Sequence, residues 1–299
     1  MMTATWTTTR GSIPWVPAAG KHPLPLGRNV YHDSRNRAYP WRTPVRTYAG
    51  LTSQLWTRHT EILDQGAVGS CTGNEQVGAL GTGPIFGALP ATHPALDETL
   101  ALEIYSGAET IDGDGPYPPN DNGSSGPSAA QVAKNLGLIS GYLHCFSLAD
   151  VLDALETGTV GIGANWYDSY DRPDSSGHVS ISPGASIRGG HEFLCRGKDT
   201  TSRVVICDNS WGPGWGREGS FTFSWDDLDR LLHEQGDGTV SLPLTVPVPP
   251  PVPVPPVPVQ NPDDVAFAAV LHPWVLVHHV GHNEQAARAA RTWLRARGL

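Results

Sequence analysis

The sequence is poor in charged residues for its length. Charged residues occupy 16% of its 299 positions, and only two methionines and four cysteines are present. Coiled coils and long charged helices need a much larger charged fraction, so this composition excludes them. Glycine (34), proline (27) and tryptophan (10) are numerous instead. We therefore expect a loop-rich globular protein with extended appendages.

Long apolar segments are also missing. No run of 18 or more apolar residues occurs, so we expect no transmembrane helix and no insertion into a membrane. The first residues contain no apolar stretch of the kind found in secretory signal peptides. These absences predict a cytoplasmic or virion-associated protein.

The cysteines are Cys71, Cys145, Cys195 and Cys207, and none of them forms the CxxC spacing of a zinc site. If Cys71 is a free nucleophile, the other three cannot all pair within the chain. We therefore expect three buried structural thiols and no disulfide, which fits a reducing compartment.

Two other clusters contain residue types that bind metal ions. Three histidines between residues 278 and 282 share one helical face, and polar residues crowd the loop 112–121. Packed or solvated histidines and ordinary turn residues explain both clusters more simply, because neither has a complete ligand spacing. The sequence thus predicts no metal and no cofactor.

Charge is distributed unevenly along the chain, whose formal net charge is −9. Residues 1–50 carry seven Lys or Arg and one Asp, a net charge of +6. Residues 51–242 carry nine basic and 25 acidic residues, a net charge of −16. An acidic body argues against nucleic acid as a partner. The basic arm is expected to lie on this body or on an acidic protein partner, and a solvated tail is the alternative.

Four regions follow from the distribution of proline and of periodic segments. Residues 1–50 are rich in proline, arginine and aromatics and predict an extended arm. Residues 51–242 predict the globular domain. Ten prolines in residues 243–262 predict a stiff polyproline linker. Residues 263–299 predict a helical tail that docks on a protein partner, since 37 residues bury little core alone.

Within the globular domain, helical patterns precede strand patterns. The expected helices are 71–80, 96–111, a helix capped by Ser128 and ended by Gly137, 150–156 and 226–234. The expected strands are 159–166, 178–182, 192–197, 203–208 and 220–223. This order predicts an α+β fold in two lobes with a site in the cleft between them.

The stretch 64–75 places Gln65 six residues before Cys71, at the start of a predicted helix. A thiol at a helix N-terminus faces the positive end of the helix dipole, which favours the nucleophilic thiolate. Gly66 and Gly69 allow a tight turn that brings the Gln65 side chain back beside the sulfur.

Two downstream motifs supply the partners that such a thiol needs. His191 follows two glycines, and Asn209 leaves a strand before Trp211 and Trp215. His191 can hold the thiol as an ion pair, and Asn209 can fix the imidazole tautomer. The Gln65 side-chain amide and the Cys71 backbone N–H could stabilise an oxyanion, and Trp211 could shield the His–Asn hydrogen bond.

Together these motifs, over residues 51–235, resemble the papain-like (C1 family) cysteine peptidases, in a variant closer to the bacterial and phage branch. The resemblance implies a two-lobe fold with a helical lobe and an antiparallel β-barrel-like lobe. It also implies that Cys71 is the nucleophile, His191 the general base and acid, Asn209 the orienter and Gln65 the oxyanion donor.

The resemblance extends to substrate binding. It places Trp215 on the leaving-group side and Ser125-Gly126 where backbone hydrogen bonds hold an extended peptide. Glu192, which follows the histidine, departs from the small residue common in the family. It either favours basic side chains in the second subsite or forms a structural salt bridge. The family's helical propeptide has no recognisable counterpart in residues 1–50.

The first hypothesis is an endopeptidase that cleaves protein or peptide substrates through an acyl-enzyme, as part of a phage virion or another assembly. The alternative is an inactive papain-like scaffold whose arm and tail bind partners. A third hypothesis is a peptidoglycan hydrolase of the Cys–His type, against which Gln65 and the motif beginning at Asn209 argue.

Overall fold

The structure is a computed structural model that describes residues 4–8, 11–15, 24–30, 37, 39–41 and 50–244. Except for its first two residues, the predicted linker 243–262 lies outside the described residues, as does the tail 263–299 with its three histidines. Among the described helices, none is long and apolar enough to cross a membrane.

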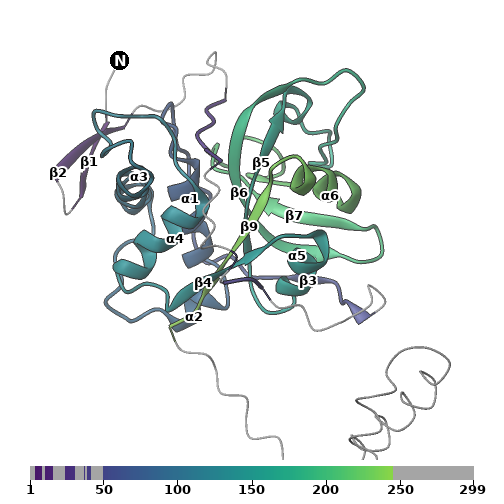
Figure 1. Cartoon of the computed structure of the whole chain (residues 1–299), viewed down its shortest axis with the longest axis horizontal. Coiled ribbons are helices and arrows are strands. Elements are labelled where there is room, and N and C mark those ends of the chain that lie inside the picture. The colour runs from purple at the N-terminus through teal and green to yellow at the C-terminus, as the bar shows by residue number, and fades with distance from the viewer. Residues whose placement is uncertain are drawn as a thin grey trace, which may run out of the picture. The chain divides into compact units, whose positions relative to one another are not determined.

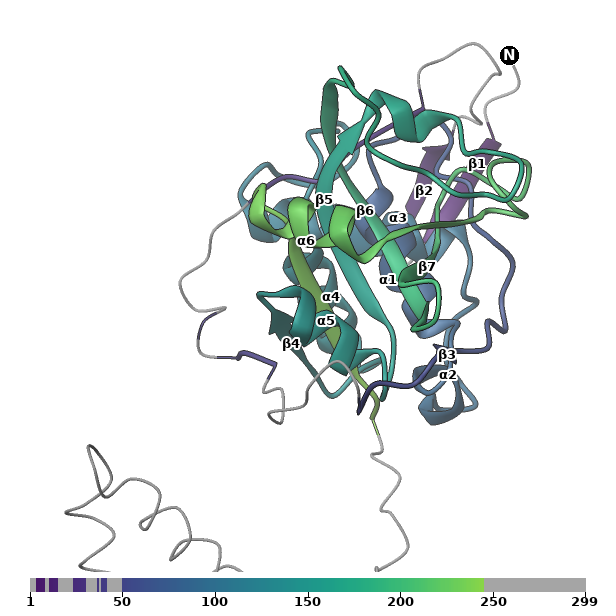
Figure 2. The same cartoon turned by 90° about the vertical axis from the view of Figure 1, so that its right-hand side faces the viewer.

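Helices and an antiparallel sheet form the two lobes of the described fold (Figure 1). The helical lobe contains α1 (Cys71–Leu80), α2 (Ile85–Ala88), α3 (Glu98–Asp112) and α4 (Gly126–Asn135). The other lobe holds α5 (Leu148–Ala154), α6 (Trp225–His233) and the 3-10 helix Asp168–Asp171 beside the sheet (Figure 2). The predicted two-lobe α+β class is confirmed.

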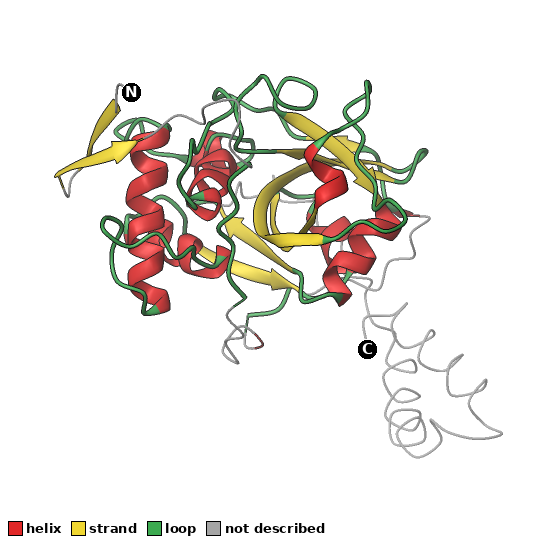
Figure 3. Cartoon of the chain, turned by 90° about the horizontal axis from the view of Figure 1, so that it is seen from above, coloured by secondary structure: helices red, strands yellow, loops and turns green. Residues whose placement is uncertain are grey.

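The described sheet has seven strands in the order β4-β9-β5-β6-β7-β8, with β3 paired to β6. Its strands are β3 (Gln54–Leu55), β4 (Gly141–Cys145), β5 (Val160–Tyr167), β6 (Ile187–Asp199), β7 (Val204–Asp208), β8 (Ser220–Ser224) and β9 (Asp237–Leu242). The expected barrel-like lobe is thus a curved but open sheet (Figure 3). In the predicted arm, β1 (Ala4–Thr8) and β2 (Gly11–Trp15) form a separate antiparallel hairpin.

Side-chain caps set where several helices begin. Asp97 accepts hydrogen bonds from the N–H groups of Thr99 and Leu100, so α3 begins two residues later than predicted. The expected cap of the next helix was wrong. Ser125 caps α4 and Ser128 lies inside its first turn, because Asp112 binds both hydroxyls and holds the chain in place.

Glycines allow α1 to approach its neighbours closely, as the sequence predicted. A Cβ on Gly73 would lie 2.1 Å from the carbonyl oxygen of Ala101 in α3. A Cβ on Gly78 would lie 3.5 Å from Leu194 in β6. The small residues therefore let α1 lie between α3 and the sheet, which fixes the position of its first residue.

Strand prediction succeeded where runs were apolar and failed elsewhere. Strands β5, β6, β7 and β8 match four of the five predicted runs. The expected strand 178–182 is wrong, because Asp174 accepts backbone N–H groups and holds this segment as a loop with a single bridge to Thr222. The sequence missed β4 and β9, which pair with each other across nearly 100 residues.

Two apolar cores lie on either side of the interface between the lobes. One core joins the sheet to α5 and α6, and Trp166 lies within it with no exposed surface. The other joins α1, α3 and α4 to one face of β6 through Leu194. Burying this apolar area supplies the main stabilisation of both lobes and holds them together along α1 and β6.

Candidate active site

Cys71 is the first residue of α1 and is fully buried. The side chain of the N-cap residue Ser70 accepts no hydrogen bond from a backbone N–H of the helix. Its hydroxyl instead donates to Asn74 Oδ1 within α1, 3.1 Å away. No side chain therefore occupies the position of an N-cap at the start of α1. The helix dipole and the N–H groups of this first turn favour negative charge at Cys71 or at an atom bound beside it.

His191 and Asn209 meet across the neighbouring strands β6 and β7. The register pairs Leu194 of β6 with Asp208, the last residue of β7. Asn209, which follows β7, therefore comes near His191, where the buried part of β6 begins. His191 Nε2 and Asn209 Oδ1 are 2.8 Å apart. His191 Nδ1 is buried and has no hydrogen-bond partner among the described residues. The asparagine thus orients the ring and leaves the other nitrogen available.

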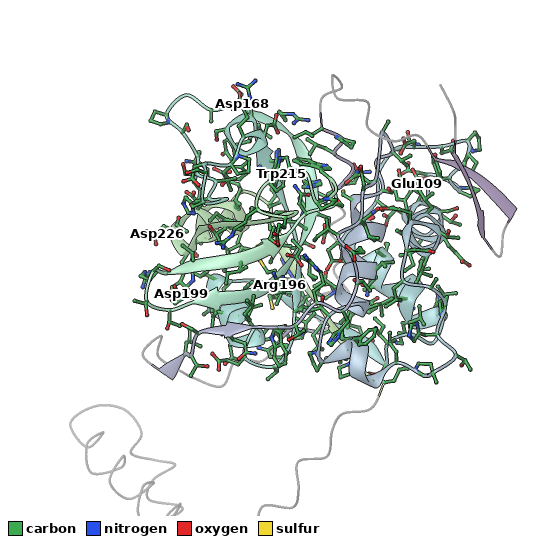
Figure 4. The ribbon with its side chains drawn as sticks, turned by 180° about the vertical axis from the view of Figure 1, so that it is seen from behind. Glu109, Asp168, Arg196, Asp199, Trp215 and Asp226 are labelled. Atoms are coloured by element: carbon green, nitrogen blue, oxygen red, sulfur yellow. The ribbon has the colours of Figure 1, made fainter. Side chains whose placement is uncertain are left out.

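Aromatic rings enclose this pair. Trp211 stacks on the His191 ring with centroids 4.8 Å apart, and Trp166 meets the same ring edge-on at 4.9 Å. Trp215, labelled in Figure 4, packs edge-on against Trp211 at 5.1 Å. These rings exclude water from the His–Asn hydrogen bond, which strengthens it. Trp166 was not among the residues that the sequence singled out, since a buried strand tryptophan is usually a core residue.

Gln65 is fully buried beside the turn that leads into α1. Its Oε1 accepts a hydrogen bond from Ser210 Oγ at 2.6 Å, and its Nε2 donates to the Val68 carbonyl at 2.8 Å. These bonds assign the amide orientation and use one of the two Nε2 hydrogens. The second hydrogen remains available to another acceptor.

Comparison with known proteins supports this architecture. No protein-family model and no curated protein matches the chain. Among solved structures, xylellain, a cysteine protease from Xylella fastidiosa, aligns with a TM-score of 0.57 and 18% identity, covering 75% of this chain and 98% of its own. Digestive procathepsin L 3 of Tenebrio molitor larval midgut aligns with a TM-score of 0.51 and 15% identity, covering 73% and 76%. Procathepsin B S9 from Trypanosoma congolense aligns with a TM-score of 0.51 and 11% identity, covering 73% and 86%.

The chain has the papain-like fold. The fold prediction is thereby confirmed, and the bacterial or phage branch stays a prediction. Identities of 11–18% speak for the fold, so the activity must be argued from the residues of this chain.

A segment of the basic arm lies in the cleft of this papain-like fold. The N–H groups of Gly27 and Arg28 donate to the Gly190 carbonyl at 3.2 and 3.0 Å. On the helical side, Ser124 N–H donates to the Gly27 carbonyl and Asn29 N–H donates to the Ser124 carbonyl, both at 2.8 Å. Residues 24–30 therefore bridge the two lobes, with one isolated β-bridge between Arg28 and Ser124.

This segment covers the thiol. A Cβ on Gly27 would lie 1.9 Å from the carbonyl oxygen of Gly69, two residues before Cys71. Trp211 Nε1 donates to the Pro25 carbonyl at 3.0 Å, so the segment also lies against the indole that stacks on His191. Cys71 and His191 have no exposed surface as a result.

Burial keeps both reactive groups uncharged in this state. It raises the pKa of the Cys71 thiol to about 12, and the nearby Glu192 charge adds to the rise. Burial lowers the pKa of His191 to about 4, against an opposing effect of the Asn209 hydrogen bond. At neutral pH the covered site thus contains a thiol and a neutral imidazole.

The predicted substrate residues differ in where they lie. The sequence analysis assigned backbone hydrogen bonds with a substrate peptide to Ser125-Gly126. In the structure the preceding residue, Ser124, makes main-chain hydrogen bonds with the arm segment 24–30. Ser125 is occupied as the cap of α4, and a Cβ on Gly126 would lie 2.2 Å from Glu192 Oε1. Glu192 is buried beside the cleft, 1% exposed.

Sequence analysis did not identify Ser124, Arg28 or Asp237 as parts of the cleft. Arg28 pairs with Asp237 across most of the chain. The one available signal was the basic arm on an acidic body. It predicted a contact between the two parts but did not identify the residues that make this contact.

The remaining cysteines lie away from the cleft surface. Cys145, Cys195 and Cys207 are buried and free, as expected. Cys195 and Cys207 are opposite each other on the neighbouring strands β6 and β7, and their thiol sulfur atoms are 2.8 Å apart. Within the described residues, no cluster of His, Cys, Asp and Glu has the geometry of a metal site.

Proposed function

We propose that this protein is a cysteine peptidase that hydrolyses protein or peptide substrates, with Cys71 as nucleophile, His191 as base and acid and Asn209 as orienter. The main support is the His191–Asn209 hydrogen bond of 2.8 Å with Nδ1 unpaired, within the papain-like fold. A structural histidine of this depth would normally satisfy both ring nitrogens.

The proposed reaction proceeds through an acyl-enzyme. The Cys71 proton passes to His191 Nδ1 as the sulfur attacks the carbonyl carbon of the substrate. The oxyanion that forms is stabilised by the Cys71 N–H and the free Gln65 Nε2 hydrogen. The imidazolium then protonates the leaving amine as the C–N bond breaks. Water attacks the thioester, His191 takes its proton, and the carboxylic acid leaves as the thiol is restored.

In this proposal the covered state is inactive. A substrate peptide needs the space over Cys71 that Gly27 fills, so residues 24–30 have to leave before catalysis. Their departure hydrates the site, which reverses the burial that raises the thiol pKa and lowers the imidazole pKa. Thiolate–imidazolium pairing then becomes possible at neutral pH.

Labelling of the thiols tests the proposal. We expect iodoacetamide or a peptidyl epoxide to modify Cys71 and spare the three other thiols, and to react faster with Arg28→Ala, which loosens the covering segment. Cys71→Ala serves as the unlabelled control. Equal or absent labelling of all four thiols in both proteins would contradict the assignment.

A scaffold without activity is the second candidate, because the two reactive residues have no exposed surface. In that case the arm and the tail 263–299 bind protein partners, with a phage virion as the proposed assembly. Cys71→Ala would then leave assembly unchanged, whereas deletion of residues 263–299 would abolish it.

A further inference from the structure

The Arg28 side chain enters a pocket in the sheet lobe, next to the thiol. It is only 3% exposed, and its Nη2 donates to the Gln235 carbonyl at 2.9 Å and to Asp237 Oδ1. Gln235 and Asp237 lie at the turn that leads from α6 into β9. A carboxylate and a carbonyl oxygen therefore hold the guanidinium in a largely buried position.

Glycines make the space that the guanidinium occupies. A Cβ on Gly163 of β5 would lie 2.6 Å from Arg28 Nε, 2.6 Å from Glu192 Oε2 and 2.7 Å from Asp237 Oδ1. The three groups thus surround one point, which a side chain at position 163 would fill. Gly126 similarly leaves the space that Glu192 Oε1 occupies from the helical side.

The pocket is acidic beyond its ion pair. Glu192 Oε2 is buried and has no hydrogen-bond partner in the described part of the chain, and the same holds for Arg28 Nη1. Glu75 of α1 lies close by, since a Cβ on Gly161 would be 2.5 Å from its Oε1. Buried carboxyl groups are costly without cationic or hydrogen-bonding partners, so this arrangement favours a cation in the pocket.

The backbone around Arg28 shows how the occupant is presented. Gly190 binds the Arg28 N–H, and Ser124 binds the residues on both sides of Arg28. An extended chain fixed by its backbone on two sides directs one side chain into the pocket. Because Gly27 covers Cys71, the pocket lies one residue away from the reaction centre.

We propose that this pocket is the specificity pocket of the peptidase, that it selects an arginine side chain in the substrate, and that Arg28 occupies it in place of the substrate. The proposal rests on the peptidase function proposed above. Arginine is favoured over lysine because the planar guanidinium presents Nη2 to the Gln235 and Asp237 oxygens while its Nε lies beside Gly163, and a lysine ammonium has one nitrogen only.

Cleavage profiling of the full-length chain tests the selectivity. We compare Arg28→Ala with Arg28→Ala/Asp237→Asn on a library of peptides that differ at one position. We expect peptides with arginine at the position entering the pocket to be cleaved at least about tenfold faster than their leucine counterparts. Asp237→Asn should lower this ratio about tenfold.

A matched control replaces an acid outside the pocket. Asp226 is 90% exposed on α6 (Figure 4), so Arg28→Ala/Asp226→Asn should keep the arginine preference. Gly163→Ala in the same background should remove it, because the methyl group fills the pocket. Cleavage without arginine preference, or a preference that survives Asp237→Asn, would overturn the proposal.

Chemical rescue tests the pocket without using activity. We expect ethylguanidinium to raise the thermal unfolding temperature of Arg28→Ala relative to Arg28→Ala/Asp237→Asn, and ethylammonium to raise it less. The double variant experiences the same solvent effect and serves as the reference. If Arg28→Ala does not fold, Arg28→Ser provides the same comparison, because its short side chain also leaves the pocket open.

The two experiments separate this proposal from the peptidase proposal. Absent rescue together with cleavage that ignores arginine overturns the pocket and leaves the peptidase standing. In the other outcome, ethylguanidinium stabilises the protein, but Cys71 is never labelled and no peptide is cleaved. That result overturns the peptidase proposal and the specificity role of the pocket, and leaves only a binding site for guanidinium groups.

Discussion

The two walls of the cleft contribute different kinds of groups. The helical wall supplies uncharged groups: the thiol of Cys71 at the start of α1, the side-chain amide of Gln65 and the backbone of Ser124. The sheet wall supplies side chains and charge, with His191, Asn209 and the acidic pocket around Arg28.

This difference follows from how each wall is built. Gln65 and Cys71 are six residues apart, so a short turn and a helix start position both. His191 and Asn209 are 18 residues apart, and Arg28 and Asp237 are 209 apart, so strand pairing and packing of the whole domain position them. Substitutions on the two walls should therefore affect activity and stability in different ways.

The largest expected effect is on the helical wall. Cys71→Ala should lower peptidase activity at least about 10⁴-fold, because the acyl-enzyme cannot form. The free energy of unfolding should change little, since alanine also fits this buried position. Peptide hydrolysis and urea unfolding measure the two quantities. Cys145→Ala, a buried thiol far from the reaction, is the control and should retain activity.

On the sheet wall, Asn209→Ala should lower kcat about 10²-fold with a small change in KM, because the imidazole loses the acceptor that orients it. The pH profile of kcat/KM should shift as well, since Asn209 stabilises the protonated ring. Asn209→Asp, which keeps an acceptor oxygen, should recover part of the loss. An unchanged pH profile for Asn209→Ala would rule out a role through His191.

His191 should also make stability depend on pH. Its pKa in the folded chain is about 4, below the ordinary 6.5, so the unfolded chain binds the proton more tightly. The stabilising contribution is complete above pH 6.5 and falls by about 3 kcal/mol as the pH drops through 6.5 toward 4. Urea unfolding of the wild type and of His191→Asn between pH 4 and 8 isolates this slope as their difference. If the free energies of unfolding of the two proteins changed with pH in the same way, the conclusion that His191 is buried as a neutral ring would be contradicted.

The smallest expected effect concerns the packing that positions α1. Gly73→Ala should destabilise the fold by about 1–3 kcal/mol, because its methyl group meets the Ala101 carbonyl. Gly87→Ala in α2 meets nothing within 4 Å and should be neutral or stabilising by up to about 1 kcal/mol. Thermal unfolding measures both changes, and equal changes would show that the close approach to α3 is relaxed in solution.

Local patterns predicted the helices well and the sheet only in part. The start of α1 at Cys71 and the strands β5 to β8 follow from the glycine-containing turn before the helix and from apolar alternation in the strands. β9 was missed because a six-residue strand that begins with an acidic residue and glycine has no clear pattern of its own. Because β9 was not predicted, its first residue, Asp237, and the acidic pocket that this residue lines were not recognised either.

The sequence by itself determined the chemical groups and the helical half of the site. It identified the thiol at a helix start, the histidine after two glycines and the asparagine before a tryptophan, because each is recognisable over a few residues. Tertiary structure alone decided that Arg28 occupies the pocket beside Gly163, Glu192 and Asp237, and that Gly27 covers Cys71. These contacts join segments far apart in the chain, and their geometry depends on the packing of the whole domain.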